Sequence, residues 1–217
     1  MAAILSFNSL AFFYSLLVLA VWLRRVLWMS KFRKSNPPLV PLERPAPEIK
    51  EKVSVIIPAR NEEKNIARCL FHLLKQSYTN IEIIIVDDRS SDRTGHLLEN
   101  FKKLSQFPMK VIRIEKLPPG WTGKNHAMFA ASKAATGSWL LFTDADTTHS
   151  AASVSTALST AVQNKIDFLT LAPETECRSF WEKTVQPLAV SSLALWCNTV
   201  NVNNEKSKRP HLSGYQS

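Results

Sequence analysis

Two aspartates one residue apart, Asp144 and Asp146, follow an apolar run that begins at Trp139. Such a run predicts a buried strand, along which successive side chains alternate between the two faces of a sheet, so that residues two apart point the same way. Open α/β sheets bind ligands at the carboxyl edge of their strands. Because carboxylate oxygens are ligands for Mg²⁺ and Mn²⁺, the pair predicts a metal and phosphate site.

A second strand of the same kind lies upstream. The apolar run 81–86 ends in Asp87 and Asp88. Two acidic strand ends in one sheet suit a nucleotide, which offers a base and ribose to one of them and a metal-bridged diphosphate to the other. The two pairs together therefore predict a nucleotide-binding edge.

Lys124 adds a cation to this set. It follows Gly123 and opens a predicted helix, so that its ammonium and the positive end of the helix could both face phosphate. The segment is not a Walker loop, because Pro118 stands where the first glycine belongs and Asn125 replaces serine or threonine. Lys124 is therefore predicted to bind nucleotide outside that motif.

These residues require strands and helices that alternate along the chain. Apolar runs predict strands at 53–58, 81–86, 110–114, 139–142 and 167–172. Helical spacing and capping residues predict helices that start at Asn61, at Ser91 or Asp92, and at Lys124. Alternation of this kind predicts an α/β fold with a parallel-cored sheet and right-handed crossovers.

The first part of the chain has a different composition. Residues Ile4 to Leu23 are almost all apolar, and about 20 such residues are what a helix needs to cross a bilayer. Basic residues follow this run, from Arg24 to Lys34, and none precedes it. This order argues against a cleaved signal peptide and predicts a single-pass anchor in the cell membrane, with the rest of the chain in the cytoplasm. A buried core helix is the alternative.

Charge and composition exclude several classes of protein. The net charge of +9 lies mostly beside the apolar run and basic patches interleaved with aromatic residues are missing, so we expect no nucleic-acid partner. The chain has 5 glycines and no G-x-G-x-x-G after a strand, which disfavours a dinucleotide oxidoreductase. Cys69, Cys177 and Cys197 have neither zinc-site nor disulfide spacing and are interpreted as buried thiols.

Three motifs in a fixed order carry a family resemblance. They are VSVIIPARNEE at 53–63, VDDRSSD at 86–92 and TDAD at 143–146. Together they resemble family 2 glycosyltransferases of the GT-A fold. LPPGWTGK at 117–124 and CRSF at 177–180 look like the membrane-bound branch that includes hopene-associated and carotenoid glycosyltransferases.

The resemblance implies a base-binding end of the site. The loop that cups the nucleotide base would be formed by Pro58, Ala59, Arg60 and Asn61. Asp88, helped by Asp87, would accept a hydrogen bond from the base. These residues would therefore set which nucleotide binds.

The resemblance also implies a diphosphate end. Asp144 would reach the ribose, and Asp146 together with Asp144 would bind Mn²⁺ or Mg²⁺, which bridges the diphosphate. His149 is close enough in the sequence to approach this metal. Trp121 would either close over the sugar or base or pack as an ordinary loop aromatic.

By the same resemblance, the chain moves a sugar from a nucleoside-diphosphate sugar to a lipid or isoprenoid acceptor, with inversion, and a UDP-sugar is expected in preference to a GDP-sugar. The GT-A sheet would be mixed, with helices on both faces. We expect an anchor with a basic flank at 1–30, a proline-rich linker at 31–51, the GT-A nucleotide-sugar-binding domain at 52–205 and an irregular tail at 206–217.

Inverting transfer also needs a general base, which this family supplies after the metal motif. The acidic residues in that region are Asp167, Glu174, Glu176, Glu182 and Glu205. None stands in an acidic pair of the family type, so the chain resembles a relative that is cut short before its acceptor half. The alternative function is a nucleotide-sugar-binding fragment without transferase activity.

A rival enzyme class shares one motif. Residues 141–148 also resemble the nucleophile motif of haloacid-dehalogenase-type phosphatases, in which the first aspartate is phosphorylated. That motif normally lies on the first strand, whereas here it lies on about the fourth, and the strand that ends in Asp87 and Asp88 would have no function. The phosphatase interpretation is therefore disfavoured.

Overall fold

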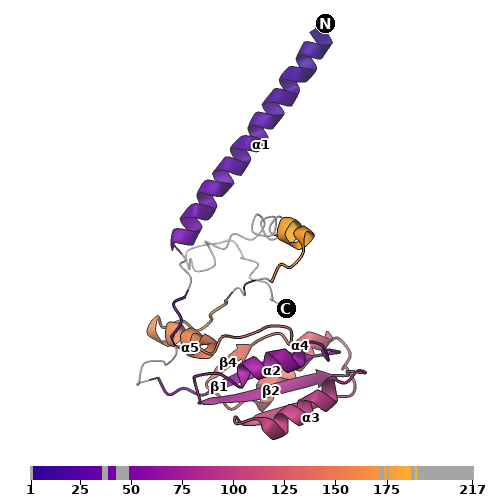
Figure 1. Cartoon of the computed structure of the whole chain (residues 1–217), viewed down its shortest axis with the longest axis vertical. Coiled ribbons are helices and arrows are strands. Elements are labelled where there is room, and N and C mark those ends of the chain that lie inside the picture. Colours follow the sequence, from indigo (N-terminus) through magenta and orange to yellow (C-terminus); the bar gives the residue numbers. More distant parts are fainter. Residues whose placement is uncertain are drawn as a thin grey trace. The chain divides into compact units, whose positions relative to one another are not determined.

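The computed structural model describes residues 2–35, 39–42, 49–171, 174, 176–186 and 189. They belong to two compact units, one formed by Leu39–Pro173 and the other by Met1–Pro38 with Glu174–Ser217. All strands of the described residues lie in the Leu39–Pro173 unit (Figure 1).

Four parallel strands form the sheet of this unit. They are β1 (Val53–Ala59), β2 (Ile81–Asp88), β3 (Met109–Ile114) and β4 (Trp139–Phe142), in the order β3-β2-β1-β4. Val53 of β1 is aligned with Ile81 of β2 and with Trp139 of β4. Because the strands share one direction and these three start at one level, their carboxyl ends meet at the same edge of the sheet.

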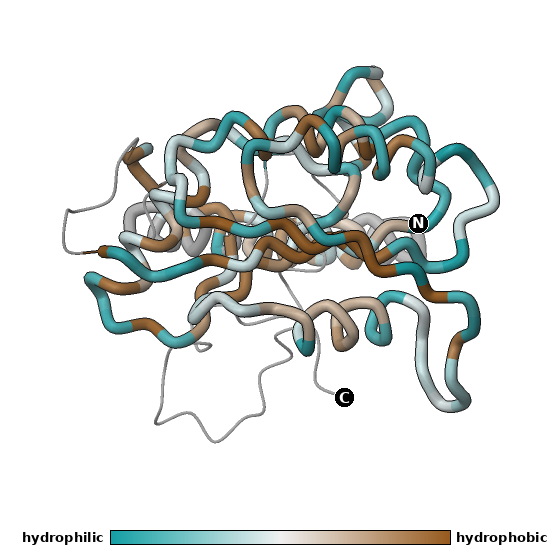
Figure 2. Tube along the Cα trace, turned by 90° about the horizontal axis from the view of Figure 1, so that it is seen from below, coloured by the Kyte–Doolittle hydropathy of each residue, from teal (hydrophilic) through white to brown (hydrophobic). Residues whose placement is uncertain are grey.

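Helices cover both faces of the sheet. They are α2 (Ile66–Leu73), α3 (Thr94–Leu104), α4 (Gly123–Ala134) and α5 (Ser153–Gln163). Ile57 of β1 packs in one core with Leu70 of α2, whereas its neighbour Ile56 packs in a second core with Ala127 of α4. Figure 2 shows the strands as an apolar layer between more polar helices. Burial on both faces explains why β1 and β2 are continuous apolar runs.

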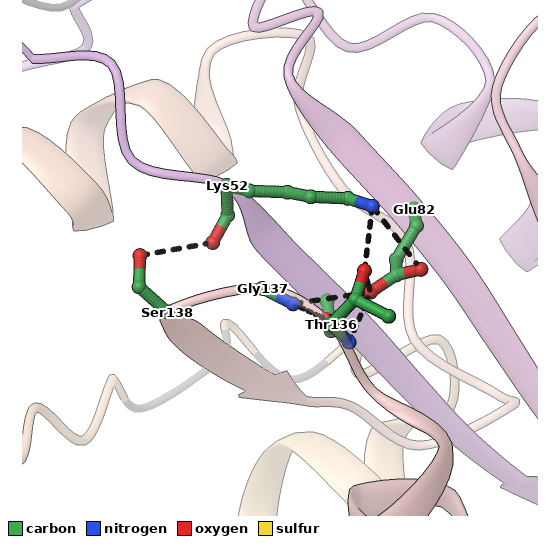
Figure 3. A network of polar contacts seen from close by, with 6 residues as sticks. Lys52, Glu82, Thr136, Gly137 and Ser138 are labelled. Carbon is green, nitrogen blue, oxygen red and sulfur yellow. Dashed lines mark hydrogen bonds and ion pairs between the residues drawn. The ribbon is translucent and has the colours of Figure 1, made fainter.

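A polar network ties the amino ends of three strands together (Figure 3). Oε1 of Glu82 in β2 accepts hydrogen bonds from the Thr136 nitrogen over 2.7 Å and from Ser54 Oγ of β1 over 2.5 Å. Gly137, which leads into β4, donates its N–H to Ser54 Oγ over 2.9 Å. Lys52 Nζ lies 3.4 Å from Glu82 Oε2. The network therefore holds β1, β2 and β4 in register.

The network keeps Glu82 charged. Burial raises the pKa of Glu82, but the hydrogen bonds from Ser54 and Thr136 and the charge of Lys52 outweigh it and lower the pKa to about 2. A Cβ on Gly137 would lie 2.7 Å from both the Lys52 oxygen and Ser54 Oγ. Glycine is therefore required where the chain enters β4.

The predicted α/β fold with a parallel-cored sheet is confirmed. The sheet is not mixed in the part of the chain that the structure describes, since β1 to β4 are all parallel. The strand predicted at 167–172 is wrong for the described residues 167–171, which are irregular, and Phe168 there is 79% exposed. A strand needs a neighbour to satisfy its backbone groups, and none of the strands among the described residues pairs with this segment.

The other unit contains the long helix α1 (Ala2–Ser35). It continues beyond residue 30 into the predicted linker, of which 36–38 and 43–48 lie outside the described residues. Within the described part of the chain, no helix is both long enough and apolar enough to cross a membrane. This finding does not support the predicted transmembrane anchor. The cellular location stays a prediction.

Replacing Glu82 by leucine is expected to lower the free energy of unfolding by about 2 kcal/mol or more at neutral pH, because the N–H groups of Thr136 and Gly137 lose a charged acceptor. Urea unfolding followed by circular dichroism measures the difference. Glu99→Leu, at an exposed position of α3, is the matched control and should change little. Equal stability of the two variants would contradict the role of the network.

The effect of E82L should also depend on pH. Because the folded state lowers the pKa of Glu82 from 4.5 to about 2, its contribution to stability is complete above pH 4.5 and is lost as the pH falls toward about 2. The stability difference between wild type and E82L should shrink over this range in the same unfolding experiment. A difference that stays constant down to pH 2 would show that the carboxylate charge is not involved.

Candidate functional site

An open cavity of about 360 Å³ lies at the carboxyl edge of the sheet. It is lined by Pro58, Ala59, Arg60, Glu62, Asp88, Gly123, Lys124, Ala127, Asp144, Ala145 and Asp146. Its volume falls in the range of small-molecule pockets, roughly 300–1,000 Å³. Two residues of the predicted site, Asn61 and Asp87, do not line the cavity. The binding roles of the others stay predictions.

The successive aspartates of β2 point to opposite faces of the sheet. The Asp87 side chain is 1% exposed and lies on the α3 side, where Oδ2 is 3.4 Å from Arg113 Nε. Its Oδ1 accepts the Ser90 N–H over 3.1 Å. A Cβ on Gly95 of α3 would come 3.1 Å from Asp87 Oδ2. Asp87 therefore packs under the loop that follows β2, and Asp88 is the aspartate that faces the cavity.

Arg89 holds both oxygens of Asp88. Arg89 Nε donates to Oδ1 over 2.7 Å and Nη2 donates to Oδ2 over 3.1 Å. The hydrogen bond from Arg89 lowers the pKa of Asp88 more than burial raises it, and the charges of Arg89 and Arg60 lower it further. Gly123 lies directly against Asp88 Oδ2, so a side chain at this position would collide with the carboxylate. A ligand that donates to Asp88 must share the carboxylate with Arg89.

The loops after β1 and β2 are linked through Asn61. Asn61 donates its N–H to Ser90 Oγ over 3.0 Å, and its Oδ1 accepts the Ser91 N–H over 2.8 Å. Both Asn61, with a φ of 55°, and Arg89, with a φ of 57°, have left-handed backbone, which asparagine tolerates better than arginine. The prediction that Asn61 caps a helix is wrong, because α2 begins at Ile66 and Asn61 bonds to the neighbouring loop.

Asp144 and Asp146 reach the cavity from the loop after β4. Both are exposed and line the cavity, whereas Ala145 between them is 3% exposed; the three residues lie beyond the end of β4, in an irregular segment and a turn. Lys124 Nζ is 2.6 Å from Asp144 Oδ1. The Asp144 carbonyl oxygen accepts the Thr147 N–H over 3.2 Å and Thr147 Oγ1 over 2.7 Å. The loop backbone is therefore fixed while the carboxylates stay accessible.

Two uncharged groups, the His149 imidazole and the Cys69 thiol, contact the loop after β4. Nε2 of His149 lies 2.9 Å from Thr143 Oγ1 and 3.3 Å from Thr147 Oγ1. Burial lowers the pKa of His149, so the imidazole is neutral. Burial also raises the pKa of Cys69 to about 12, and its thiol donates to the Asp144 oxygen over 3.7 Å. His149 thus contacts threonines of the loop, and its predicted approach to a metal stays a prediction.

The carboxylates of Asp144 and Asp146 fit a divalent metal whose remaining coordination positions are filled by a bound ligand. Among the residues that the structure describes, no group of three or more His, Cys, Asp or Glu side chains could hold a metal. Asp144 and Asp146 nevertheless offer two carboxylates on one cavity wall. Mg²⁺ is commonly bound by one or two carboxylates together with substrate phosphates. The arrangement suits a metal that arrives with a phosphate ligand.

Trp121 packs on α4. Its ring centroid lies 5.1 Å from that of Phe129 and 5.5 Å from that of His126. These contacts fit the packed loop aromatic, while Trp121 remains 38% exposed and its closing over the sugar or base stays a prediction.

Two of the acidic residues considered as a general base take part in local structure. Glu182 Oε2 accepts the N–H groups of Arg178 and Ser179, each over 2.8 Å, at the start of a helical turn, which is a capping box. Glu176 Oε2 lies 2.7 Å from Arg178 Nη2. Glu205, Cys197 and the tail at 206–217 lie outside the described residues.

Several residues that line the cavity had no predicted role. They are Glu62, Gly123, Ala127 and Ala145. Glu62 stands inside the first motif and Gly123 immediately before Lys124, so the motifs contained a signal for both. Ala127 lies one helical turn after Gly123 and was therefore on the same face of α4. The contact between Arg89 and Asp88 had no signal beyond their adjacency.

Comparison with known proteins identifies relatives. The family model described as "Glycosyl transferase family 2" matches residues 54–215. The "Uncharacterized glycosyltransferase EpsJ" of Bacillus subtilis is 33% identical over 117 residues, which are 54% of this chain and 32% of EpsJ. The 4,4'-diaponeurosporenoate glycosyltransferase of Staphylococcus haemolyticus is 36% identical over 101 residues, which are 46% of this chain and 25% of that protein. The matched region thus spans a third or less of these relatives.

A solved structure shares the fold. The mannosyltransferase PcManGT from Pyrobaculum calidifontis, in complex with GDP-Man and Mn²⁺, matches with a TM-score of 0.50 and 23% identity. The match covers 66% of this chain and 39% of PcManGT. At this identity the likeness shows the fold alone, which is the α/β arrangement of GT-A transferases.

Replacing Arg89 by glycine is expected to raise the pKa of Asp88 toward its ordinary value of 3.8, because the hydrogen bond that lowers it most is lost. An NMR titration of the Asp88 carboxyl carbon measures this change. Arg93→Gly removes a neighbouring arginine that pairs with Glu63 and should leave the pKa of Asp88 unchanged. If R89G also leaves it unchanged, Arg89 is not the cause of the shift.

Proposed function

The chain belongs to glycosyltransferase family 2, and we propose that its cavity binds a nucleoside-diphosphate sugar as the donor of a glycosyl transfer. The observation that carries this proposal is the meeting of Asp88, Lys124, Asp144 and Asp146 in one cavity. A nucleotide sugar has a base that forms hydrogen bonds and a diphosphate that needs cations. The cavity offers groups for both.

The base would lie at the Asp88 end. Pro58, Ala59 and Arg60 line the cavity beside Asp88, and the low pKa of Asp88 keeps it an acceptor at neutral pH. A pyrimidine is smaller than a purine, and a cavity of about 360 Å³ is near the lower end of the range for ligand pockets. The small cavity volume supports a UDP-sugar in preference to a GDP-sugar.

The diphosphate would lie at the other end. Lys124 and the first N–H groups of α4 provide positive charge there. Asp144 and Asp146 would hold Mn²⁺ or Mg²⁺, with Asp144 also within reach of the ribose. The bound metal would act as a Lewis acid that stabilises the departing nucleoside diphosphate.

For the acceptor we propose a lipid or isoprenoid and transfer with inversion. One relative is named for transfer to 4,4'-diaponeurosporenoate. Leu140 and Phe142 of β4 are 41% and 43% exposed, because α4 packs over β1 and β2 and leaves this part of the sheet face open. Phe142 stands two residues before Asp144. An apolar acceptor could therefore lie on β4 next to the donor.

A second candidate function is binding of the nucleotide sugar without transfer. It is favoured by the local contacts of two candidate bases, since the Glu182 carboxylate caps a helical turn and the Glu176 carboxylate pairs with Arg178. General acid-base catalysis contributes roughly 10²- to 10⁴-fold, so a chain without a base would retain little transfer.

Donor binding is expected to depend on a divalent metal. Calorimetry with UDP and GDP should show tighter binding with Mn²⁺ than in EDTA, and Asp146→Ala should abolish that difference. Asp88→Ala should weaken nucleotide binding by about 1–3 kcal/mol, because a charge-assisted hydrogen bond is lost. Asp167→Ala, at an exposed position beyond α5, is the control. Equal affinity of the wild type in Mn²⁺ and in EDTA would refute the metal site.

Transfer and binding can be separated in one assay. The chain is incubated with a radiolabelled UDP-sugar, Mn²⁺ and a membrane lipid extract, and label in the organic phase is counted. The second candidate function predicts label there at least tenfold below that of an active family 2 glycosyltransferase assayed in parallel, because the carboxylates of Glu176 and Glu182 are engaged in local contacts. Robust labelling that D146A abolishes would establish the transferase and exclude the second candidate function.

A further inference from the structure

We propose that Lys124 is a tethered cation that occupies the metal-binding side of Asp144 until the donor arrives, so that the divalent metal binds firmly only together with the nucleoside diphosphate. The inference rests on the proposed function of the same cavity. It adds a reason why metal and nucleotide bind as a pair.

The ion pair has the geometry that this exchange needs. Lys124 Nζ lies 2.6 Å from Asp144 Oδ1, and the two side chains are 48% and 55% exposed. The pair is thus in direct contact, yet open to the cavity that both residues line. An ammonium at this distance occupies a position from which a metal would coordinate the same oxygen.

Of the two partners, Lys124 is the one that can leave. The carbonyl oxygen of Asp144 accepts two hydrogen bonds from Thr147 and one from Cys69, which fix the backbone behind the carboxylate. Lys124 reaches Asp144 through a flexible four-carbon side chain. Movement of the ammonium therefore leaves the aspartate in place.

Charge determines when the exchange takes place. A divalent metal at Asp144 would lie a few ångströms from the Lys124 ammonium, and like charges at such distances repel strongly. A diphosphate entering the cavity attracts the ammonium toward the amino end of α4, where helix N–H groups also favour anions. Asp144 is then released to the metal. By thermodynamic reciprocity, the nucleotide strengthens metal binding by the same factor as the metal strengthens nucleotide binding.

Binding of Mn²⁺ alone tests the inference without any assay of activity. Free Mn²⁺ is measured by electron paramagnetic resonance during titration of the full chain in the absence of nucleotide. Lys124→Met should bind Mn²⁺ about tenfold more tightly than the wild type, because the competing charge is gone. Lys124→Gln provides a second neutral variant, and Lys124→Arg should behave like the wild type. Lys133→Met, on the same helix with its ammonium over the Phe129 ring, is the matched control.

Two further arms locate the effect. Once Asp144 is replaced by asparagine, the K124M substitution should no longer raise the Mn²⁺ affinity, since the carboxylate that Lys124 and Mn²⁺ compete for is absent. Addition of UDP should tighten Mn²⁺ binding to the wild type by a larger factor than to K124M. Mn²⁺ affinities of K124M and K124Q within about twofold of the wild type would overturn the inference, because an exposed ion pair would then have no measurable effect. Absence of UDP binding by wild type and all variants would instead refute the proposed function.

Discussion

The hydrogen-bond ladder of β1, with β2 on one side and β4 on the other, sets the position of every cavity residue that follows a strand. Ala59 is level with Asp87, and the Thr143 N–H continues the ladder by donating to the Ile56 oxygen over 3.0 Å. A slip of one residue in this register would exchange Asp87 and Asp88 between the two faces of the sheet. The Glu82 network prevents such a slip from the amino end, which leaves the carboxyl end free for a ligand.

The two ends of the cavity differ in how firmly their charges are held. The Asp88 side chain is 5% exposed and accepts hydrogen bonds from Nε and Nη2 of the planar Arg89 guanidinium, a geometry that gives strong and directional pairing. Asp144 and Lys124 are about half exposed, and exposed ion pairs contribute only about 0–1 kcal/mol. The Asp88 end is therefore ordered before any ligand binds, whereas the Asp144 end can change its ion pairs at little energetic cost.

The parts of the structure that depend on local periodicity were predictable from the sequence. The apolar runs predicted β1 to β4, and the aspartates that follow β2 and β4 predicted the cavity at the carboxyl edge of the sheet. The two-residue period of a strand also implies that Asp87 and Asp88 point to opposite faces, so only one of them could enter a single cavity.

Contacts between distant segments were not predictable. Asn61 has the side chain of a helix cap, but its oxygen bonds to Ser91 in another loop. Glu82 is a charged residue within an apolar strand. Its partners Thr136 and Gly137 are separated from it in the sequence by two helices and a strand. The segment at 167–171 has strand-forming residues, yet a strand also needs a free neighbour, which composition does not reveal.

The connection from β1 to β4 has a consequence for the order of folding. β4 is 4 residues long and pairs with β1, from which β2, β3 and three helices separate it in the sequence. Among the strand pairs of the sheet, β1 with β4 closes the longest loop and so has the largest loop-closure entropy cost. Its ladder is also the shortest and contributes the fewest hydrogen bonds. β4 should therefore join the sheet last and detach first. Gradual denaturation would then release the loop that carries Asp144 and Asp146 while β1 and β2 are still paired, so ligand binding would be lost well before the core melts.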